Sequence, residues 1–240
     1  MKRKIISLFF IFTISLLFSE TVKLPDGSIF YGSIKNGLFE GEGTIKWETG
    51  GSYTGQFKAG QYFGSGILVT KMYKYEGEFK DGLFNGDGTI TYSNGTVYTG
   101  KFKNGLYNGQ GNINDIAGTN FVGEFKDNQK NGMGFLKLSI GDSYSGNFES
   151  DMFNGKGVYT YSNGDQYVGF FKNGMFDGEG KLTTSQRVYE GVFSQGQLPE
   201  KYKKRTSSLA QFFKISFFVS ITFNVVCIIL LLKKKGTKIK

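Results

Sequence analysis

The side chains that most often perform catalysis are scarce in this sequence. The chain of 240 residues contains no histidine, and its one cysteine, Cys227, lies in a long apolar run. Histidine-based acid–base catalysis, thiol nucleophiles and Cys/His zinc sites therefore have no candidates. Paired carboxylates are the remaining catalytic option, and acids do occur between the glycines of a recurring Gly-x-Gly, at Glu42, Asp87 and Glu179.

These acids do not recur regularly enough to indicate a site. The equivalent position in the other copies holds Ser65, Gln110, Met133 and Lys156. A calcium site would need a loop rich in oxygen ligands, which the sequence lacks. We therefore interpret the acids as part of a solvated edge and expect a non-enzymatic protein with no catalytic residues, no cofactor and no metal.

The glycines belong to a sequence motif, aromatic-x-Gly, that recurs along most of the chain. Successive copies are 22 or 23 residues apart and begin at Phe30, Tyr53, Tyr75, Tyr98, Phe121, Tyr144, Tyr167 and Tyr189. A fixed period of this length indicates a repeat architecture. Seven units are complete, an eighth stops near Pro199, and a half unit, residues 24–29, precedes the first.

Each unit reads as one β-hairpin. In the fourth unit Tyr98, Gly100 and Phe102 alternate with polar residues and so share one face of a strand. Asn104-Gly105 then supplies a tight turn, because both residues tolerate a positive φ. The residues expected on one face of the following strand are Tyr107, Gly109, Gly111 and Ile113.

Glycines on the aromatic face leave room for large rings to lie over bare backbone. A phosphate-binding loop is the competing interpretation of so many glycines. It fails because no unit continues into Gly-x-x-Gly and no helix follows to receive an anion. The glycines are expected to be structural.

The units resemble the MORN (membrane occupation and recognition nexus) repeat. The matching segments are YEGEFKDGLFNGDG (75–88), YTGKFKNGLYNGQG (98–111) and YVGFFKNGMFDGEG (167–180), and the resemblance covers residues 24–198. It implies an all-β fold, an elongated single-layer array of consecutive antiparallel hairpins with a grooved face. It also implies a scaffold role in protein association, dimerisation or membrane apposition, with occasional binding of acidic lipid.

The two ends of the chain look unlike the repeats. Residues 1–21 have a basic start and then an apolar run, which predicts a signal peptide or, if uncleaved, a signal-anchor helix. Residues 209–232 include eighteen uncharged residues, 215–232, followed by three lysines, which predicts a C-terminal transmembrane helix. A basic juxtamembrane linker (199–208) and a basic tail (233–240) complete the predicted organisation.

Charge supports this division and argues against nucleic acid as a partner. The net charge of +9 comes from nine basic residues at the two ends, whereas residues 20–208 hold equal numbers of basic and acidic residues. A nucleic-acid groove would place its positive charge within the folded repeats. Lysines beside the apolar ends predict an integral membrane protein with its array on the non-cytoplasmic side, in a secretory lumen, at the cell surface or in a periplasm.

Two local features lead to further expectations. The fifth unit has Asp127-Asn128 at its turn and Gln129-Lys130 in place of an apolar-aromatic pair. These departures predict that it is the least stable hairpin, and therefore a bend or a docking site. The alternative is sequence drift without consequence, which an array of repeats tolerates in one unit. Asn94 begins the one Asn-Gly-Thr sequon and is a candidate for glycosylation if the array lies in a eukaryotic secretory lumen.

The sequence thus favours a membrane-anchored scaffold that binds a protein partner, with homodimerisation open. Uncovered parts of the aromatic face would form the binding surface, although most rings are expected in the core. One alternative is a membrane tether that binds acidic lipid, resembling a small junctophilin. However, residues 24–198 carry a net charge of −3, which does not favour anionic headgroups. Another alternative is an envelope protein that binds glycan on the aromatic face.

Overall fold

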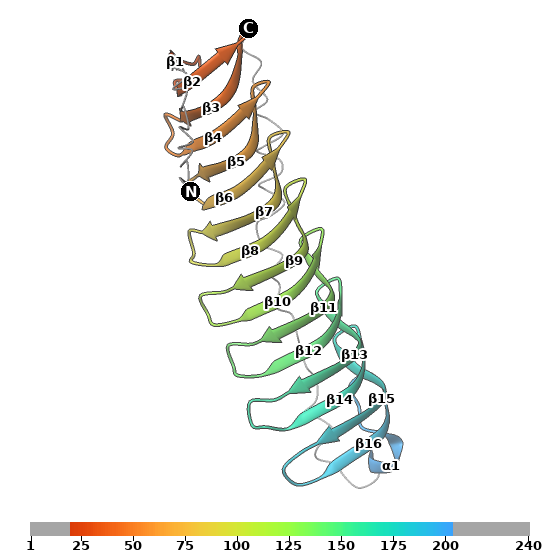
Figure 1. The fold of residues 1–240 in the computed structure, drawn as a ribbon. Coiled ribbons are helices and arrows are strands. Elements are labelled where there is room, and N and C mark those ends of the chain that lie inside the picture. The colour runs from red at the N-terminus through yellow and green to blue at the C-terminus, as the bar shows by residue number, and fades with distance from the viewer. Residues whose placement is uncertain (1–19, 204–240) are drawn as a thin grey trace, which may run out of the picture.

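The computed structural model describes residues 20–203, which form one antiparallel sheet of sixteen strands (Figure 1). The strands follow one another in chain order, so each pairs only with its sequence neighbours. A four-residue helix, α1 (Glu200–Lys203), follows the last strand. The strands are β1 (Glu20–Lys23), β2 (Ile29–Lys35), β3 (Leu38–Lys46), β4 (Ser52–Lys58), β5 (Gln61–Val69), β6 (Tyr73–Lys80), β7 (Leu83–Tyr92), β8 (Val97–Lys103), β9 (Leu106–Asn114), β10 (Asn120–Lys126), β11 (Gln129–Lys137), β12 (Ser143–Glu149), β13 (Met152–Thr160), β14 (Gln166–Lys172), β15 (Met175–Thr183) and β16 (Val188–Phe193).

The predicted hairpins are present, and their turns have the expected backbone. Asn104 and Gly105, between β8 and β9, have φ values of 51° and 83°. Positive φ at both central residues suits the right-handed twist of the strands that the turn joins. The fifth unit keeps this conformation without glycine, since Asp127 and Asn128 have φ values of 50° and 71°. Short polar side chains that bond to nearby backbone tolerate this region better than most.

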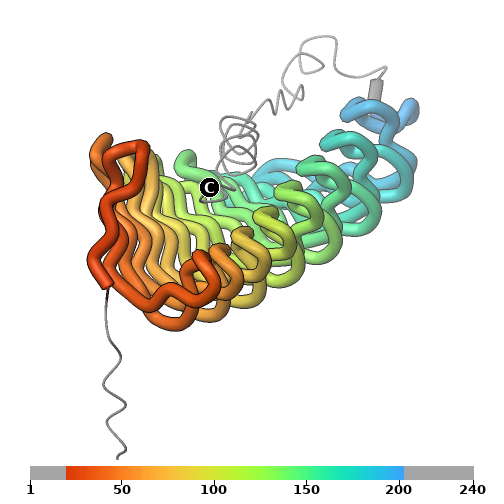
Figure 2. The backbone as a smooth tube through the Cα atoms, turned by 90° about the horizontal axis from the view of Figure 1, so that it is seen from above, coloured from red at the N-terminus to blue at the C-terminus, as the bar shows by residue number. Residues whose placement is uncertain are grey.

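The strands bend towards their aromatic face. Four residues of a flat strand would place Tyr98 and Phe102 about 13 Å apart, yet their ring centroids are 5.2 Å apart. The sheet therefore curves into an open trough along its length (Figure 2). We call the concave, aromatic side the inner face and the opposite side the outer face.

The two glycines of Gly-x-Gly have different roles, which corrects one prediction. Gly111 pairs with Gly100 on the inner face, but the pairing register then shifts, so that Phe102 lies opposite Tyr107. Gly109 lies in this irregular stretch with a φ of +101°, and a Cβ on it would meet the Lys101 side chain, which is on the outer face. Gly109 therefore does not face the same way as Tyr107, because the bulge interrupts the alternation.

The prediction that the fold also contains a transmembrane helix is wrong. Within residues 20–203 no helix is long and apolar enough to cross a membrane. The helix α1 has four residues, whereas a span needs roughly 20, and the repeats form strands because their apolar residues alternate with period two. The integral membrane location that was predicted from such a helix is corrected with it. The segments assigned to the signal and transmembrane helices lie outside the described residues, apart from residues 20 and 21.

Candidate interaction surfaces

The inner face is a continuous column of aromatic rings. Tyr98 shows the arrangement: its ring stacks on Tyr107 at 3.6 Å and meets the edges of Phe102 and Phe125, each at 5.2 Å. Its hydroxyl donates to the Lys101 carbonyl at 2.9 Å. Phe125 belongs to the next unit, so the ring contacts join one hairpin to the next as well as closing each hairpin.

The same packing buries every aromatic residue that begins a unit. At most 8 % of any of these side chains is exposed; they are Phe30, Tyr53, Tyr75, Tyr98, Phe121, Tyr144, Tyr167 and Tyr189. The Tyr98 ring lies directly over Gly100 and Gly111, where an added Cβ would be 2.7 Å and 2.5 Å from its hydroxyl oxygen. Since the rings are covered by each other and by backbone, they are not free to stack on a glycan, a base or a partner's side chain.

Burial keeps the inner-face tyrosines neutral. Loss of hydration raises the pKa of Tyr73 and Tyr167 to about 12, and burial raises the pKa of Tyr98 further. Their hydroxyls therefore stay protonated at any physiological pH. Five of these phenols donate to backbone carbonyls and so hold the trough together; they are Tyr53, Tyr75, Tyr98, Tyr144 and Tyr167.

The acids singled out in the sequence are not brought together. Glu42, Asp87 and Glu179 lie on β3, β7 and β15, on the outer face. Asp87 forms an exposed ion pair with Lys101 at 3.0 Å. Among residues 20–203, no three side chains of the metal-binding types lie close enough to hold an ion. These carboxylates thus form neither a catalytic pair nor a metal centre.

Lys130, in the fifth unit, occupies the place that a ring fills in its neighbours. It is buried, and its ammonium lies 5.6 Å from the centroid of Phe121 and 3.1 Å from a carboxylate oxygen of Asp151. The same carboxylate accepts the Lys130 N–H at 3.0 Å. Asn128 makes the equivalent bond one unit earlier, accepting the Tyr107 N–H at 2.8 Å. The sequence marked Lys130 as a departure but not Asp151, which compensates for it from the next turn.

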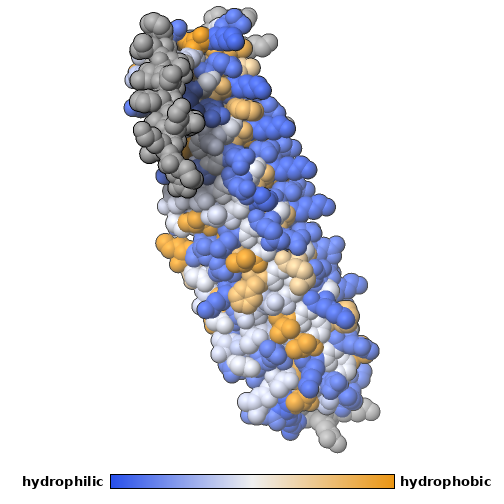
Figure 3. Space-filling model, viewed as in Figure 1, coloured by the Kyte–Doolittle hydropathy of each residue, from blue (hydrophilic) through white to orange (hydrophobic). Residues whose placement is uncertain are grey.

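The outer face carries one exposed or half-exposed row of side chains that crosses successive strands, here called the outer row. The cross-strand pairs run continuously, from Glu76 on β6 through each strand to Val168 on β14. Members of the row are Glu76, Thr89, Thr99, Asn112, Val122, Phe135, Ser145, Val158 and Val168. Apolar side chains also interrupt the hydrophilic surface of the molecule in Figure 3. Five members of the row directly follow the initial aromatic of a unit, but a single unit does not show that they form one row with the other four.

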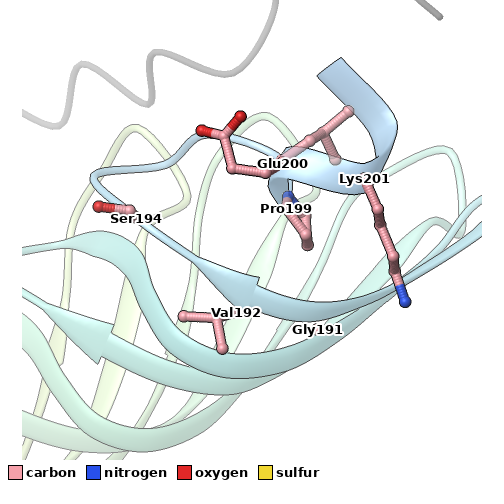
Figure 4. Close-up of a pocket in the computed structure, with 7 residues that line it drawn as sticks. Gly191, Val192, Ser194, Pro199, Glu200 and Lys201 are labelled. Carbon is pink, nitrogen blue, oxygen red and sulfur yellow. The ribbon is translucent and has the colours of Figure 1, made fainter. Parts of the chain in front are cut away.

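The last strand ends beside a shallow hollow of about 410 Å³ (Figure 4). Pro199 packs between α1 and β16, 3.4 Å from where a Cβ on Gly191 would lie. The Tyr202 hydroxyl accepts the Glu190 N–H at 3.4 Å. Proline cannot donate to a ladder, so this segment turns the chain away from the sheet edge. The polar groups that line the hollow do not converge on one point. The hollow results from the way Pro199 and α1 pack against β16.

Asn94 lies in the exposed loop between β7 and β8. Its side-chain oxygen accepts the Thr96 N–H at 3.0 Å. The sequon therefore forms a local turn at the surface, and Asn94 is exposed.

The fold and its surfaces define a class: a single-layer array of hairpin repeats with a closed aromatic inner face. The MORN repeat family model matches residues 30–52, 53–71, 75–97, 98–112, 121–143, 144–166 and 167–185, more than half of the chain. The chain therefore belongs to the MORN repeat family, whose repeats form scaffolds for protein or lipid interaction.

Solved structures offer only a distant likeness. One is the TCP domain of SAS-4 (dCPAP) of Drosophila melanogaster in complex with a proline-rich motif of Ana2 (dSTIL), at 13% identity and a TM-score of 0.39, covering 73% of this chain and 91% of that one. The TCP10c domain of Drosophila melanogaster Sas-4 gives 13% identity and a TM-score of 0.36, with 73% and 100% covered. These scores are too low for either structure to bear on function. A comparison with curated proteins finds no match.

Proposed function

We propose that this protein is a non-enzymatic scaffold that binds a protein partner on the outer face of its repeat array. The observation that carries the proposal is the contrast between the two faces. On the inner face the aromatic rings are buried against one another, and the initial aromatic of each unit is at most 8 % exposed. The outer face presents side chains that the fold does not need for its own core.

The geometry of the array suits such a role. Each strand from β2 to β15 pairs with both neighbours, and the ring column continues from unit to unit. A single-layer array of this kind offers an extended surface whose side chains keep fixed spacings, as repeat proteins commonly do. Protein is favoured over anionic lipid because residues 24–198 carry a net charge of −3.

The test is site-specific photo-crosslinking in cells that produce the full chain. A photoreactive residue is placed at Thr99 or Ser145 on the outer row, and as a control at Asn163 in an exposed loop. We expect a discrete protein adduct from at least one outer-row position and none from the loop. Absence of a protein adduct from every outer-row position, or adducts with lipid alone, would contradict the proposal.

A further inference from the structure

One part of the outer face is mostly apolar: four of the five strands β10–β14 present apolar side chains there, and Ser145 on β12 interrupts them. Val122 on β10 lies opposite Phe135 on β11, and the outer row continues through Ser145 and Val158 to Val168 on β14. Phe135 is 44 % exposed and Val168 46 %. The adjacent positions towards the turns add Met133 and Phe170, at 58 % and 38 %. We call this set of residues, Val122, Met133, Phe135, Val158, Val168 and Phe170, the outer patch.

Exposed apolar side chains that adjoin one another differ from scattered ones. A contiguous patch on a folded protein commonly marks an interaction site, because its burial is favourable. None of the outer patch is needed by the aromatic column, which lies on the other face of the same strands. The patch therefore has no role in the core that would account for its composition.

Unpaired positive charge lies on both sides of the patch. Lys137 is next to Phe135 towards the inter-hairpin loops, and Lys156 is next to Val158 towards the turns. Lys156 lies 5.4 Å from the ring centroid of Phe170, and neither lysine forms an ion pair within residues 20–203. At the β10 end of the patch, Glu124 is next to Val122 on the outer face. The outer-face positions nearest the patch on β11–β14 contain no acid; they are Lys137, Ser143, Ser145, Asn147, Lys156, Thr160 and Gln166. A partner that covers the patch is thus favoured if its own flanks are acidic.

The backbone of the partner is constrained as well. Strands β10–β14 are paired along both edges, so the patch offers side chains but no free strand edge to which another strand could be added. A helix satisfies its own backbone hydrogen bonds and can present one apolar stripe. Five strands span about 19 Å across the sheet, which corresponds to a helix of about 13 residues. Helical turns repeat every ~5.4 Å and strands every ~4.8 Å, so several side chains can meet over this length.

We propose that the outer patch is the docking surface for an amphipathic helix of a protein partner, with acidic residues on both sides of the helix's apolar stripe. This inference rests on the proposed scaffold function and names the chemistry of its partner. The apolar stripe packs along Val122, Phe135, Val158 and Val168. The acidic flanks lie near Lys137 and Lys156.

The experiment measures binding of designed fluorescent peptides to the full chain by anisotropy. One peptide is a helix of about four turns with leucines on one face and glutamates beside them; a second has lysines in place of the glutamates. A double variant, Phe135→Thr with Val168→Thr, removes much of the patch. Its matched control is Thr89→Ser with Thr99→Ser, which changes the same row over β7 and β8.

We expect the acidic peptide to bind at least about tenfold more tightly than the basic one, with a rise in helical circular dichroism. The patch variant should weaken this binding about tenfold or more, and the control variant should leave it unchanged. Reversing the charges with Lys137→Glu and Lys156→Glu should favour the basic peptide. Hydrogen exchange on each variant verifies that the hairpins remain folded.

Three results would overturn the inference: equal binding of both peptides, acidic-peptide binding that survives in the folded patch variant, or self-association of the full chain that the patch variant abolishes. The last would assign the patch to a second copy of this chain. Crosslinks from Thr99 without binding at the patch would leave the scaffold function standing and remove only this inference. Absence of crosslinks from any outer-row position would remove the scaffold function itself.

Discussion

The outer face over β6–β9 and the outer face over β10–β14 have the same backbone and different chemistry. Over β6–β9 the outer row is polar: Glu76, Thr89, Thr99 and Asn112. The Thr89 and Thr99 hydroxyls bond to each other at 3.0 Å, and nearby charges pair with each other, Lys74 with Glu76 and Lys101 with Asp87, both at 3.0 Å.

Over β10–β14 the same row is apolar except at Ser145, and Lys137 and Lys156 beside it form no ion pair within residues 20–203. Apart from Lys130, which replaces one ring on β11, the inner face keeps the same packing in both regions: Tyr75 and Tyr144 stack on Phe84 and Phe153 at the same centroid distance of 3.8 Å. Packing therefore restricts one face of every strand and leaves the other free to differ between regions. A difference in chemistry between two parts of such an array is therefore found on the face that the core does not use.

The strongest test of the shared inner face is a pair of glycine substitutions, one in each region. Gly88→Ala and Gly157→Ala place a Cβ 2.5 Å from the hydroxyl oxygens of Tyr75 and Tyr144. We expect each substitution to lower the free energy of unfolding by about 2–3 kcal/mol, because the tyrosine ring must move out of a packed column. Hydrogen exchange of the affected hairpins is the measurement, with Ser145→Ala as a control. Costs that differ by more than about 1 kcal/mol would show that the two regions are not equivalent inside.

High pH should destabilise both regions together. Burial raises the pKa of Tyr73 on β6 and Tyr167 on β14 to about 12, whereas tyrosine in an unfolded chain ionises near pH 10. Stability is therefore full below about pH 10 and is lost as pH rises towards 12, because only the unfolded state releases protons in that window. Alkaline titration followed by tyrosinate absorbance and circular dichroism checks this. Normal tyrosine ionisation at about pH 10 with the fold intact would contradict the burial of these hydroxyls.

The inner-face difference at Lys130, which lies within β10–β14, can be probed at the turn that contains Asp151. Asp151→Gly keeps a residue suited to the φ of 67° and removes the carboxylate bonded to Lys130. We expect a loss of about 1–2 kcal/mol, less than for a fully buried pair, because the Asp151 side chain is 34% exposed. Asn128→Gly is the matched neutral control and should cost less. Faster amide exchange confined to the fifth and sixth units would locate the effect, and equal losses in the two variants would mean that the ion pair adds nothing.

The smallest effect on stability is expected from the outer row. Phe135→Thr makes the apolar row resemble the polar one and leaves the column untouched. The free energy of unfolding should change by less than about 0.5 kcal/mol, as for most surface substitutions. Thermal unfolding measures it, with Thr99→Ser as the reference. A loss above about 2 kcal/mol would mean that Phe135 stabilises the sheet. The apolar row over β10–β14 would then be explained by its contribution to folding and not by binding.

Much of the fold could be predicted from the sequence because its signals are local. Alternation across Tyr98, Gly100 and Phe102 specifies strands, and a turn pair such as Asn104-Gly105 specifies a hairpin within a few residues. The candidate site was less predictable. The initial aromatics were identified as a group, but whether any ring stayed open to a partner depends on how hairpins stack, which one unit does not reveal.

The sequence by itself determined the repeat, its period, the hairpin in each unit and the aromatic side of each strand, since these follow from spacings within 23 residues. Only the tertiary structure decided that Gly109 lies in a bulge, that the rings close the inner face completely, and that Asp151 stabilises a lysine 21 positions earlier. The continuous outer row also belongs to this second group. Its members are brought side by side by the pairing of strands, and that register is fixed by the bend, the bulges and the packing of one hairpin on the next.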